Sequence, residues 1–495
     1  MRATNVKNRG SCGRGVRFAG ARALPLAAAA AVALVSAALA PAAAAPMHEL
    51  AGQAGARAPG VGPPAAYRVA ADSLIDAALG DSAAWERLAE MVDRFGHRFS
   101  GSESLERALD WILREMTEDG LENVRAQPVM VPHWVRNQES LRLLEPVPSE
   151  MPMLGLGGSV GTPPGGITAE VLIVGSFDEL AERADDARGR IVLFDVPFTS
   201  YGETVRYRVN GAVAAASVGA VASLIRSVTP HSMRTPHTGT MQYEEGVPRI
   251  PHAAITVEDA LKLRRIAGRG DVPVVHLEMG AETLPDAPSR NVMGEVVGRE
   301  LPDEVVVVGG HIDSWDVGDG AMDDGGGSVV AWEAVRLMKD LGLRPRRTVR
   351  VVLWTNEENG LRGANAYAEE APSTVLAIES DAGVFRPAGF GFTGSDEAFE
   401  TVAAVAALLD RIGAGEVWRG GGGADIAPLM QRGVPGMGLR VDGTRYFWYH
   451  HSAADTLDKL DPAEMALCVA AMAVMAYVIA DLPEALPRVE EGGAP

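Results

Sequence analysis

The most informative pattern in the sequence consists of two neighbouring segments, Gly310-His311-Ile312-Asp313-Ser314-Trp315-Asp316 and Ala321-Met322-Asp323-Asp324-Gly325-Gly326-Gly327. The β-branched run at 304–308 directly before it predicts a strand that is buried on both faces. His311 and Asp313 then follow the carboxyl end of that strand, where open α/β sheets bind their ligands. Carboxylates and an imidazole packed this closely would repel one another or lose hydration at a cost, unless a cation holds them. The stretch therefore predicts half of a metal site.

Strand and helix patterns alternate on both sides of this stretch. Strands are predicted at 292–297, 305–308, 348–354, 375–378, 389–392 and 437–440, and helices at 327–341, 361–370, 396–412 and 461–482. No internal repeat is evident. The alternation predicts an α/β fold with a mixed, mostly parallel sheet and helices on both faces.

The other half of the metal site is predicted at the ends of the later strands. Glu357-Glu358 and Asp381 follow two buried strands, and His450-His451 lies on a loop before the last helix. Taken singly, these residues also fit surface salt bridges, a helix cap and a hydrogen-bonded structural histidine. Because all of them follow strands of one sheet, the set favours metal ligands, with one carboxylate left free to move a proton.

The first 45 residues predict a secretory signal peptide. They carry six basic residues and no acidic one, followed by an Ala-rich apolar run and small residues up to a cleavage site near Ala45. An uncleaved anchor is the alternative, but the apolar run is short and weakly hydrophobic for a span. Residues 46–65, rich in Ala, Gly and Pro, predict a disordered lead-in. No other stretch is expected to be long and apolar enough to span a bilayer.

Charge and cysteine content narrow the function classes. The chain has a formal net charge of −20, and loss of the signal segment would bring it to about −26. Such acidity argues against nucleic acid and anionic membranes as partners, so no stable membrane association is expected after cleavage. Only Cys468 would remain, which excludes an intrachain disulfide and predicts a buried small apolar residue. These features indicate a secreted or periplasmic protein.

The length of 495 residues predicts more than one domain. Gly- and Pro-rich loops between 154 and 166 open a β-rich region, which predicts an inserted domain over 147–287, closed by the prolines at 285 and 288. The catalytic domain would then consist of 66–146 and 288–485, with a disordered tail at 486–495. Four histidines of the inserted region are scattered in sequence and are predicted to be surface or loop groups rather than ligands: His231, His237, His252 and His276.

The order His-x-Asp, Asp, Glu-Glu, Asp, His resembles the M28 family of di-zinc peptidases. The similarity includes Leu353-Trp-Thr-Asn-Glu-Glu, Glu379-Ser-Asp-Ala-Gly and His450-His-Ser-Ala-Ala-Asp-Thr. It extends beyond the site to Arg98-Phe-Ser-Gly-Ser and Pro236-His-Thr-Gly, and so covers essentially the whole mature chain. The resemblance implies a zinc exopeptidase fold and a protease-associated type of inserted domain.

The resemblance also assigns roles. It makes His311, Asp323 and Asp381 the ligands of one zinc ion, and Asp323, Glu358 and His451 the ligands of a second, so that Asp323 bridges them. Imidazole and carboxylate suit Zn²⁺, although Mn²⁺ or Co²⁺ would fit the same ligands. Glu357 would be the general base for a metal-activated water, and Asp313 would hydrogen-bond the His311 ring.

Several other residues receive roles outside the two ligand sets. Asp316, Asp319 and Asp324 become scaffold rather than ligands by the resemblance. It also suggests a strained, cis peptide between Asp323 and Asp324. His450 takes the place of a tyrosine that steadies the tetrahedral intermediate in several relatives, a role that an imidazole N–H also fits. Asp425 and Arg440 are candidates for binding the termini of the substrate, but loop or structural roles are favoured for both.

The expected function is therefore that of an exported dinuclear zinc exopeptidase that hydrolyses small peptides, above all unblocked dipeptides, and forms a homodimer. An aminopeptidase that acts on longer peptides is the alternative within the family. A glutaminyl-cyclase-type activity is disfavoured by the full hydrolytic set. An inactive receptor or scaffold is disfavoured because all five ligands and Glu357 are present.

Overall fold

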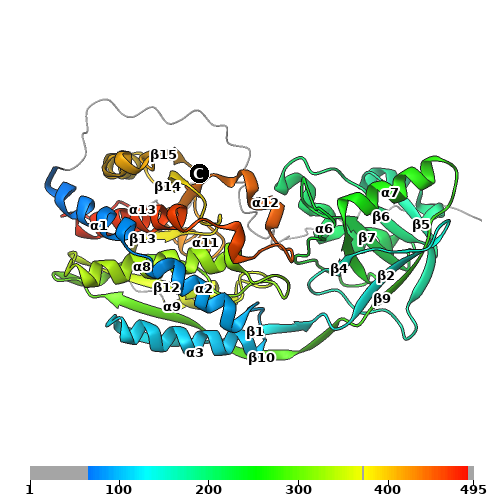
Figure 1. The fold of residues 1–495 in the computed structure, drawn as a ribbon, viewed down its shortest axis with the longest axis horizontal. Helices are drawn as coiled ribbons and strands as arrows, with labels where there is room; N and C mark the ends of the chain where they lie inside the picture. Colours follow the sequence, from blue (N-terminus) through cyan, green and yellow to red (C-terminus); the bar gives the residue numbers. More distant parts are fainter. Residues whose placement is uncertain (1–64, 371–372, 489–495) are drawn as a thin grey trace, which may run out of the picture. The chain divides into compact units, whose positions relative to one another are not determined.

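The computed structural model describes residues 65–370 and 373–488. The predicted signal peptide and almost all of the predicted lead-in lie outside the described residues. Two eight-stranded sheets form the framework, and each has helices packed on it (Figure 1).

The first sheet confirms the predicted mixed topology. Its strands are, in spatial order, β1 (Glu122–Val135), β10 (Glu282–Val296), β12 (Arg347–Trp354), β11 (Leu301–His311), β13 (Ser373–Glu379), β16 (Gly436–Val441), β14 (Pro387–Thr393) and β15 (Glu416–Arg419). The central strands β12, β11, β13 and β16 are mutually parallel, whereas β10 and β14 run antiparallel to their central neighbours. Parallel strands end at the same edge, so the segments that follow β11, β12 and β13 meet there.

Helices cover both faces of this sheet, as predicted. Val306 and Val308 of β11 pack into the core formed with α8 (Gly326–Asp340), α13 (Pro462–Asp481) and α1 (Arg68–Gly80). Val305 and Val307 face the opposite core, with α9 (Arg362–Glu370) and α11 (Ala427–Met430). Alternate residues of a strand point to opposite faces, so an uninterrupted valine run suits a strand that is covered on both sides. The remaining helices of this part are α2 (Ala83–Phe95), α3 (Glu103–Glu118), α10 (Asp396–Ala406) and α12 (Tyr446–Tyr449).

Helix α13 corrects one expectation. The helix has 20 residues and is, by length and composition, long and apolar enough to cross a membrane. The sequence analysis expected no such segment after the signal peptide. Most of the helix is buried inside the protein, however, against α1 and α8. Cys468 lies in this buried helix, as predicted, and its thiol contacts the carbonyl oxygen of Phe385 at 3.1 Å. The composition of α13 is therefore that of a central core helix.

The second sheet arises from residues 139–279. Its order is β3 (Ser149–Glu150), β2 (Glu139–Glu145), β9 (Val274–Met279), β5 (Ile167–Val174), β6 (Ile191–Phe194), β7 (Ala222–Arg226), β8 (His252–Ile255) and β4 (Met153–Gly155). Its helices are α4 (Phe177–Glu182), α5 (Ala184–Ala187), α6 (Tyr201–Ser217) and α7 (Val257–Gly268). Two apolar clusters fill it. Its identification as a protease-associated-type domain stays a prediction.

The boundaries of this region differ from the sequence prediction. Strand β2 precedes residue 147 but pairs with β9 in the second sheet. The prolines at 285 and 288 do not end a domain, because both lie inside the continuous strand β10, where Pro288 is opposite Met130 of β1. This half of β10 is exposed, and proline is tolerated where a strand N–H need not be paired. At the other end of the chain, Leu486 of the predicted disordered tail is buried in the core.

Arg98 connects the segment after α2 to the loop after β11. The side chain is 0% exposed, and its guanidinium donates to the carbonyl oxygens of Ile312 (2.8 Å), Asp319 (2.8 Å) and Gly320 (2.7 Å). A guanidinium presents five N–H donors in a fixed fork and can thus fix several loop carbonyls at once. Arg98 therefore sets the shape of the loop between His311 and Asp323.

We expect Arg98→Met to lower the free energy of unfolding by about 3–5 kcal/mol, because three buried carbonyl groups lose their donor. Denaturant titration measures the change. The matched control is Arg94→Met, whose side chain is 58% exposed and whose loss should change the free energy by about 0.5 kcal/mol or less. A loss below about 1 kcal/mol for Arg98→Met would contradict this role.

Candidate metal centre

The sheet edge brings the predicted ligands together. His311 is the last residue of β11 and is opposite Trp354, the last residue of β12. Glu379, the last residue of β13, is opposite Gly309 of β11. Glu357, Glu358 and Asp381 thus leave adjacent strands at the same level as His311.

Asp323 is presented by a short irregular turn, Ala321–Gly325. The peptide between Asp323 and Asp324 is cis, which confirms the prediction. The Asp455 carboxylate accepts hydrogen bonds from the main-chain N–H groups of Met322 (2.7 Å) and Asp323 (3.1 Å). The Asp324 carboxylate accepts from the N–H of His311 at 3.1 Å. Asp324 and Asp455 thus hold the turn in place, as expected of scaffold groups.

The two oxygens of the Asp323 carboxylate face two separate groups. Oδ1 lies 3.3 Å from Nε2 of His311, which is itself 3.5 Å from Oδ1 of Asp381. Oδ2 lies 3.4 Å from Nε2 of His451, which is 3.0 Å from Oε2 of Glu358. The five residues that the resemblance implies as ligands therefore lie around one carboxylate. The donor atoms that lie closest together form two groups, His311, Asp323 and Asp381 in the first and Asp323, His450 and His451 in the second.

The donor atoms of this arrangement are suited to binding a metal ion. Asp323 Oδ2 and Glu358 Oε1 are buried and have no hydrogen-bond partner among the described residues. Leaving such atoms unpaired is costly, whereas a cation would satisfy both. Convergent imidazole nitrogens and carboxylate oxygens are also the donors that Zn²⁺ prefers.

The pKa shifts at the centre also favour a bound cation. Burial, and then the neighbouring Asp323, raise the pKa of Glu358 well above its ordinary value. Burial lowers the pKa of His311, but contacts with Asp323 and Asp381 outweigh it and raise that pKa well above 6.5. The carboxylates thus carry more negative charge than the protein side chains compensate, and a divalent cation would correct the imbalance.

Glu357 stands beside the ligands without joining either set. Burial and the surrounding carboxylates raise the pKa of Glu357 to about 8, although the charge of His311 opposes this. Among the described residues, no hydrogen bond or ion pair engages its carboxylate. A carboxylate that is close to a metal set, but free of it, is suited to proton transfer.

Asp313 is placed differently from the prediction. Nδ1 of His311 lies 2.9 Å from the main-chain carbonyl oxygen of Asp313, whereas the Asp313 carboxylate is 3.9 Å from it. That carboxylate instead accepts from the main-chain N–H groups of Glu357 (3.0 Å) and Glu358 (3.4 Å). Residue 313 thus orients the ring through its main chain and holds the Glu357-Glu358 segment through its side chain. Sequence spacing does not distinguish between these two groups.

His450 is close to the same carboxylate. Its Nε2 lies 3.6 Å from Asp323 Oδ2, and its ring stacks on that of His451 with a centroid distance of 3.5 Å. Tyr201, Tyr446 and Phe447 surround the ring. Burial lowers the pKa of His450 to about 3, so the imidazole is neutral and retains one N–H to donate.

Residues of the second sheet's region reach the same loops, which sequence reasoning missed. His237 lies in a loop, one of the two placements predicted for it, but it is buried, and its Nδ1 lies 2.7 Å from the His450 carbonyl oxygen. The Thr238 N–H donates to the His451 carbonyl oxygen at 2.8 Å. The Thr240 hydroxyl donates to the Glu358 carbonyl oxygen at 2.6 Å.

His252 is buried as well, against its prediction as a surface group. Its Nδ1 lies 2.6 Å from Ser223 Oγ, and its Nε2 lies 3.1 Å from the carbonyl oxygen of Arg208 in α6. The Arg208 guanidinium in turn lies 3.4 Å from Nδ1 of His451. The motif Pro236-His-Thr-Gly was the only sequence signal for this support. Long-range contacts of this kind cannot be read from local spacing.

Two of the remaining candidates, Asp316 and Arg440, have partners outside the ligand sets. Asp316 forms an ion pair with Arg136 at 2.6 Å, and the Arg440 guanidinium lies over the Trp418 ring at 5.1 Å. Arg440 is thus placed in a structural stacking role. Asp425 is buried beside Glu379, whose position at the end of β13 had drawn no functional prediction.

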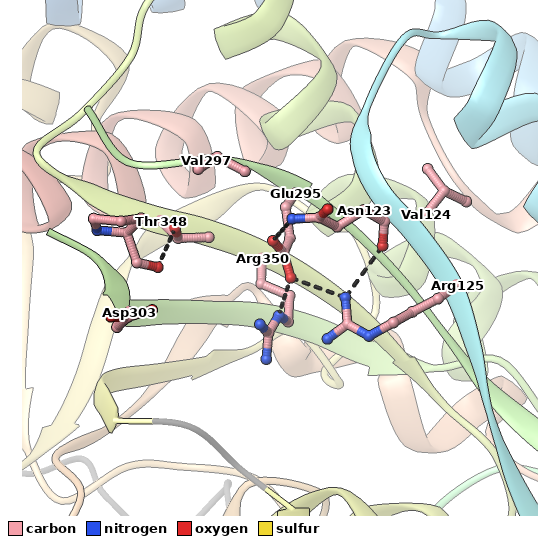
Figure 2. A pocket seen from close by; sticks show the side chains of 9 residues that line it. Asn123, Val124, Arg125, Glu295, Val297, Asp303, Thr348 and Arg350 are labelled. Atoms are coloured by element: carbon pink, nitrogen blue, oxygen red, sulfur yellow. Dashed lines mark hydrogen bonds and ion pairs between the residues drawn. The ribbon is translucent and has the colours of Figure 1, made fainter. Parts of the chain in front are cut away.

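A cavity of about 520 Å³ lies elsewhere, beside the first half of β12 (Figure 2). Glu295 at its centre accepts hydrogen bonds from Asn123, Arg125 and Arg350, so its charge is already compensated. The lining residue Thr348 is six residues, or about 20 Å along the strand, from the end of β12 that carries the metal ligands. This cavity belongs to a different part of the sheet.

Comparison with known proteins agrees with the geometry. Residues 291–476 match the model of peptidase family M28. The chain is 52% identical to carboxypeptidase Q of Mus musculus over 82% of this chain and 87% of that protein. It resembles the crystal structure of a peptidase M28 precursor from Shewanella amazonensis with a TM-score of 0.83 and 35% identity, over 86% of this chain and 99% of that one. A zinc aminopeptidase from Bacillus subtilis shares the fold, with a TM-score of 0.61 and 19% identity over 82% and 98% of the two chains.

Metal removal should destabilise the protein. After dialysis against a chelator, addition of Zn²⁺ at about 100 times its dissociation constant should restore about 2.7 kcal/mol of stability, measured as a shift of the thermal unfolding midpoint. Asp323→Ala should abolish the shift, because both ligand sets share this carboxylate. The control Asp396→Asn, at a side chain that is 89% exposed, should keep it. A full shift in Asp323→Ala would refute the metal site.

Proposed function

The chain belongs to peptidase family M28 and is a metallopeptidase, and from this premise we propose that it is a dinuclear zinc exopeptidase which hydrolyses small unblocked peptides, above all dipeptides. The observation that carries the proposal is the Asp323 carboxylate, whose two oxygens face two separate sets of ligands. Export by the N-terminal signal and assembly into a homodimer remain predictions.

Each proposed zinc has three protein ligands. His311, Asp323 and Asp381 would hold one, and Asp323, Glu358 and His451 the other. Bound at these positions, the metals would supply Lewis-acid polarisation of the scissile carbonyl and activation of a water. The Asp455 and Asp324 contacts fix the bridging carboxylate before substrate arrives.

Glu357 is the proposed general base. Its free carboxylate accepts a proton from the attacking water and passes it to the nitrogen of the leaving amine. Glu357 stands beside the ligands without belonging to either set, which leaves its carboxylate free to take up and release a proton. Asp313 supports this step by fixing the main chain at Glu357 through its carboxylate.

His450 is the proposed donor to the oxyanion that develops on the scissile carbonyl. Its imidazole is neutral and buried and stands beside the bridging carboxylate, so its N–H is close to where negative charge would form. The aromatic rings around it exclude water, which strengthens such a hydrogen bond.

The proposed function is tested with a panel of free dipeptides and longer peptides. The zinc-loaded enzyme should hydrolyse dipeptides, lose activity in chelator and regain it with Zn²⁺. Glu357→Gln should lower kcat by about 10²–10⁴-fold while the metal content stays unchanged. The control Glu397→Gln, at an exposed position, should behave as the wild type.

Activity that survives chelation, or that survives Glu357→Gln, would contradict the mechanism. If dipeptides are inert while longer peptides lose their N-terminal residues one at a time, the protein is an aminopeptidase of the same family instead.

The roles of the two adjacent histidines are separable. We expect His451→Gln to lose one zinc per chain, because it removes a ligand of the second set. His450→Gln should retain both metals and lower kcat about 10²-fold without a comparable change in KM. Elemental analysis of dialysed protein, together with steady-state kinetics, gives both quantities. The reverse pattern would make His450 the ligand.

A further inference from the structure

Two buried carboxylates beside the metal centre have no role in the mechanism above. Glu379 is the last residue of β13, and Asp425 lies in the turn before α11. Each is 1% exposed. Neither belongs to a proposed ligand set, so each is a buried acid that requires a separate explanation.

The turn that carries Asp425 closes over the Glu379 carboxylate. The N–H of Ile426 donates to Glu379 Oε2 at 2.9 Å. A Cβ added to Gly423 would lie 2.0 to 2.3 Å from the Glu379 carboxylate atoms, so residue 423 has to be glycine for the turn to come this close. Asp425 is thereby held next to Glu379.

Three of the four carboxylate oxygens of this pair are unpartnered. Glu379 Oε1 and both oxygens of Asp425 are buried and have no hydrogen-bond donor among the described residues. A buried acceptor without a donor costs about 1–3 kcal/mol, and more if it is charged. The pair therefore lacks a donor group, and a cationic donor would both pair with these oxygens and offset the charge of an ionised carboxylate.

The pair lies next to the reacting groups. Glu379 is the last residue of β13 and is opposite Gly309 of β11, and Asp381 follows it two residues later. The charges of Glu357 and His311 act on both Glu379 and Asp425. The turn next to the pair consists of small residues, Gly421, Gly422, Gly423 and Ala424, all half-buried.

We propose that Glu379 and Asp425 bind the free α-ammonium group of the peptide substrate. A primary ammonium has three N–H donors, which match the three unpartnered oxygens in number, and its positive charge is opposite in sign to that of a carboxylate. The inference rests on the proposed peptidase function and adds to it the reason for an unblocked N-terminus. A peptide without the ammonium would leave the three oxygens unpaired, and binding sites built in this way reject such analogues strongly.

The test compares L-alanyl-L-alanine with propanoyl-L-alanine, which has the same scissile bond and lacks only the amino group. The zinc-loaded wild type should favour the dipeptide at least about 100-fold in kcat/KM. Asp425→Asn should lower kcat/KM for the dipeptide about 30–100-fold and change that for propanoyl-L-alanine less than about threefold. The control Asp396→Asn should leave both values unchanged.

Binding is measured separately from turnover in the Glu357→Gln background. Calorimetry should show that L-alanyl-L-alanine binds at least about 30-fold more tightly than propanoyl-L-alanine, and that adding Asp425→Asn or Glu379→Gln removes the difference. Failure of hydrolysis with this difference intact would refute the proposed peptidase function but not the ammonium site. Hydrolysis without any dependence on the ammonium would refute the site alone.

Two further outcomes would overturn the inference. An equal loss for both substrates in Asp425→Asn would show that the pair supports the site's structure or its proton transfer. A requirement for Na⁺ or K⁺, with no preference for the ammonium, would show that an inorganic cation occupies the pair.

Gly423→Ala gives a further test, because it places a methyl group against Glu379 and should lower the preference for the ammonium substrate. An unchanged preference would count against the site.

Discussion

The position of one carboxylate, Asp323, sets the arrangement of the whole centre. Its two oxygens face His311 and His451, which come from the end of β11 and from the loop before the last helix. The carboxylate can do this because Asp455 accepts hydrogen bonds from the main chain of the turn Ala321–Gly325 and so fixes it. In addition, the parallel strands β11 and β12 end at the same edge of the sheet. The other proposed roles depend on closeness to this carboxylate. They belong to the free acid Glu357, the neutral imidazole of His450, and the buried pair Glu379 and Asp425.

Support for the centre comes from both sheets. The first sheet supplies the strand ends, while the region of the second sheet supplies main-chain and side-chain contacts to the segments that carry His450, His451 and Glu358. Contacts of this kind fix ligand orientation, and changes to them commonly affect metal affinity and activity as strongly as changes to a ligand. Substitutions in the second sheet's region should therefore be interpreted together with the metal centre.

Much of this could be predicted from sequence, for identifiable reasons. The valine run of β11 and the acids that follow β12 and β13 are local patterns, so the sheet and a metal site at its edge were within reach, whereas the division into two ligand sets came from the resemblance to family M28. Other features depend on contacts between distant segments. The burial of His237 and His252 is decided by packing against remote loops, and the use of the Asp313 carbonyl in place of its carboxylate is decided by ring geometry. The prolines of β10 predicted a boundary, because an exposed paired strand and a loop can share the same composition. Glu379 and Asp425 are 46 residues apart, and only the fold shows them as a pair without a donor.

The most direct test of the central claim is anomalous X-ray diffraction from crystals of the zinc-loaded protein, recorded on both sides of the zinc absorption edge. We expect an arrangement of two anomalous peaks per chain, one on each side of the Asp323 carboxylate, with His311 and Asp381 at the first, Glu358 and His451 at the second, and Glu357 at neither. A single peak, or two peaks that do not share Asp323, would contradict it.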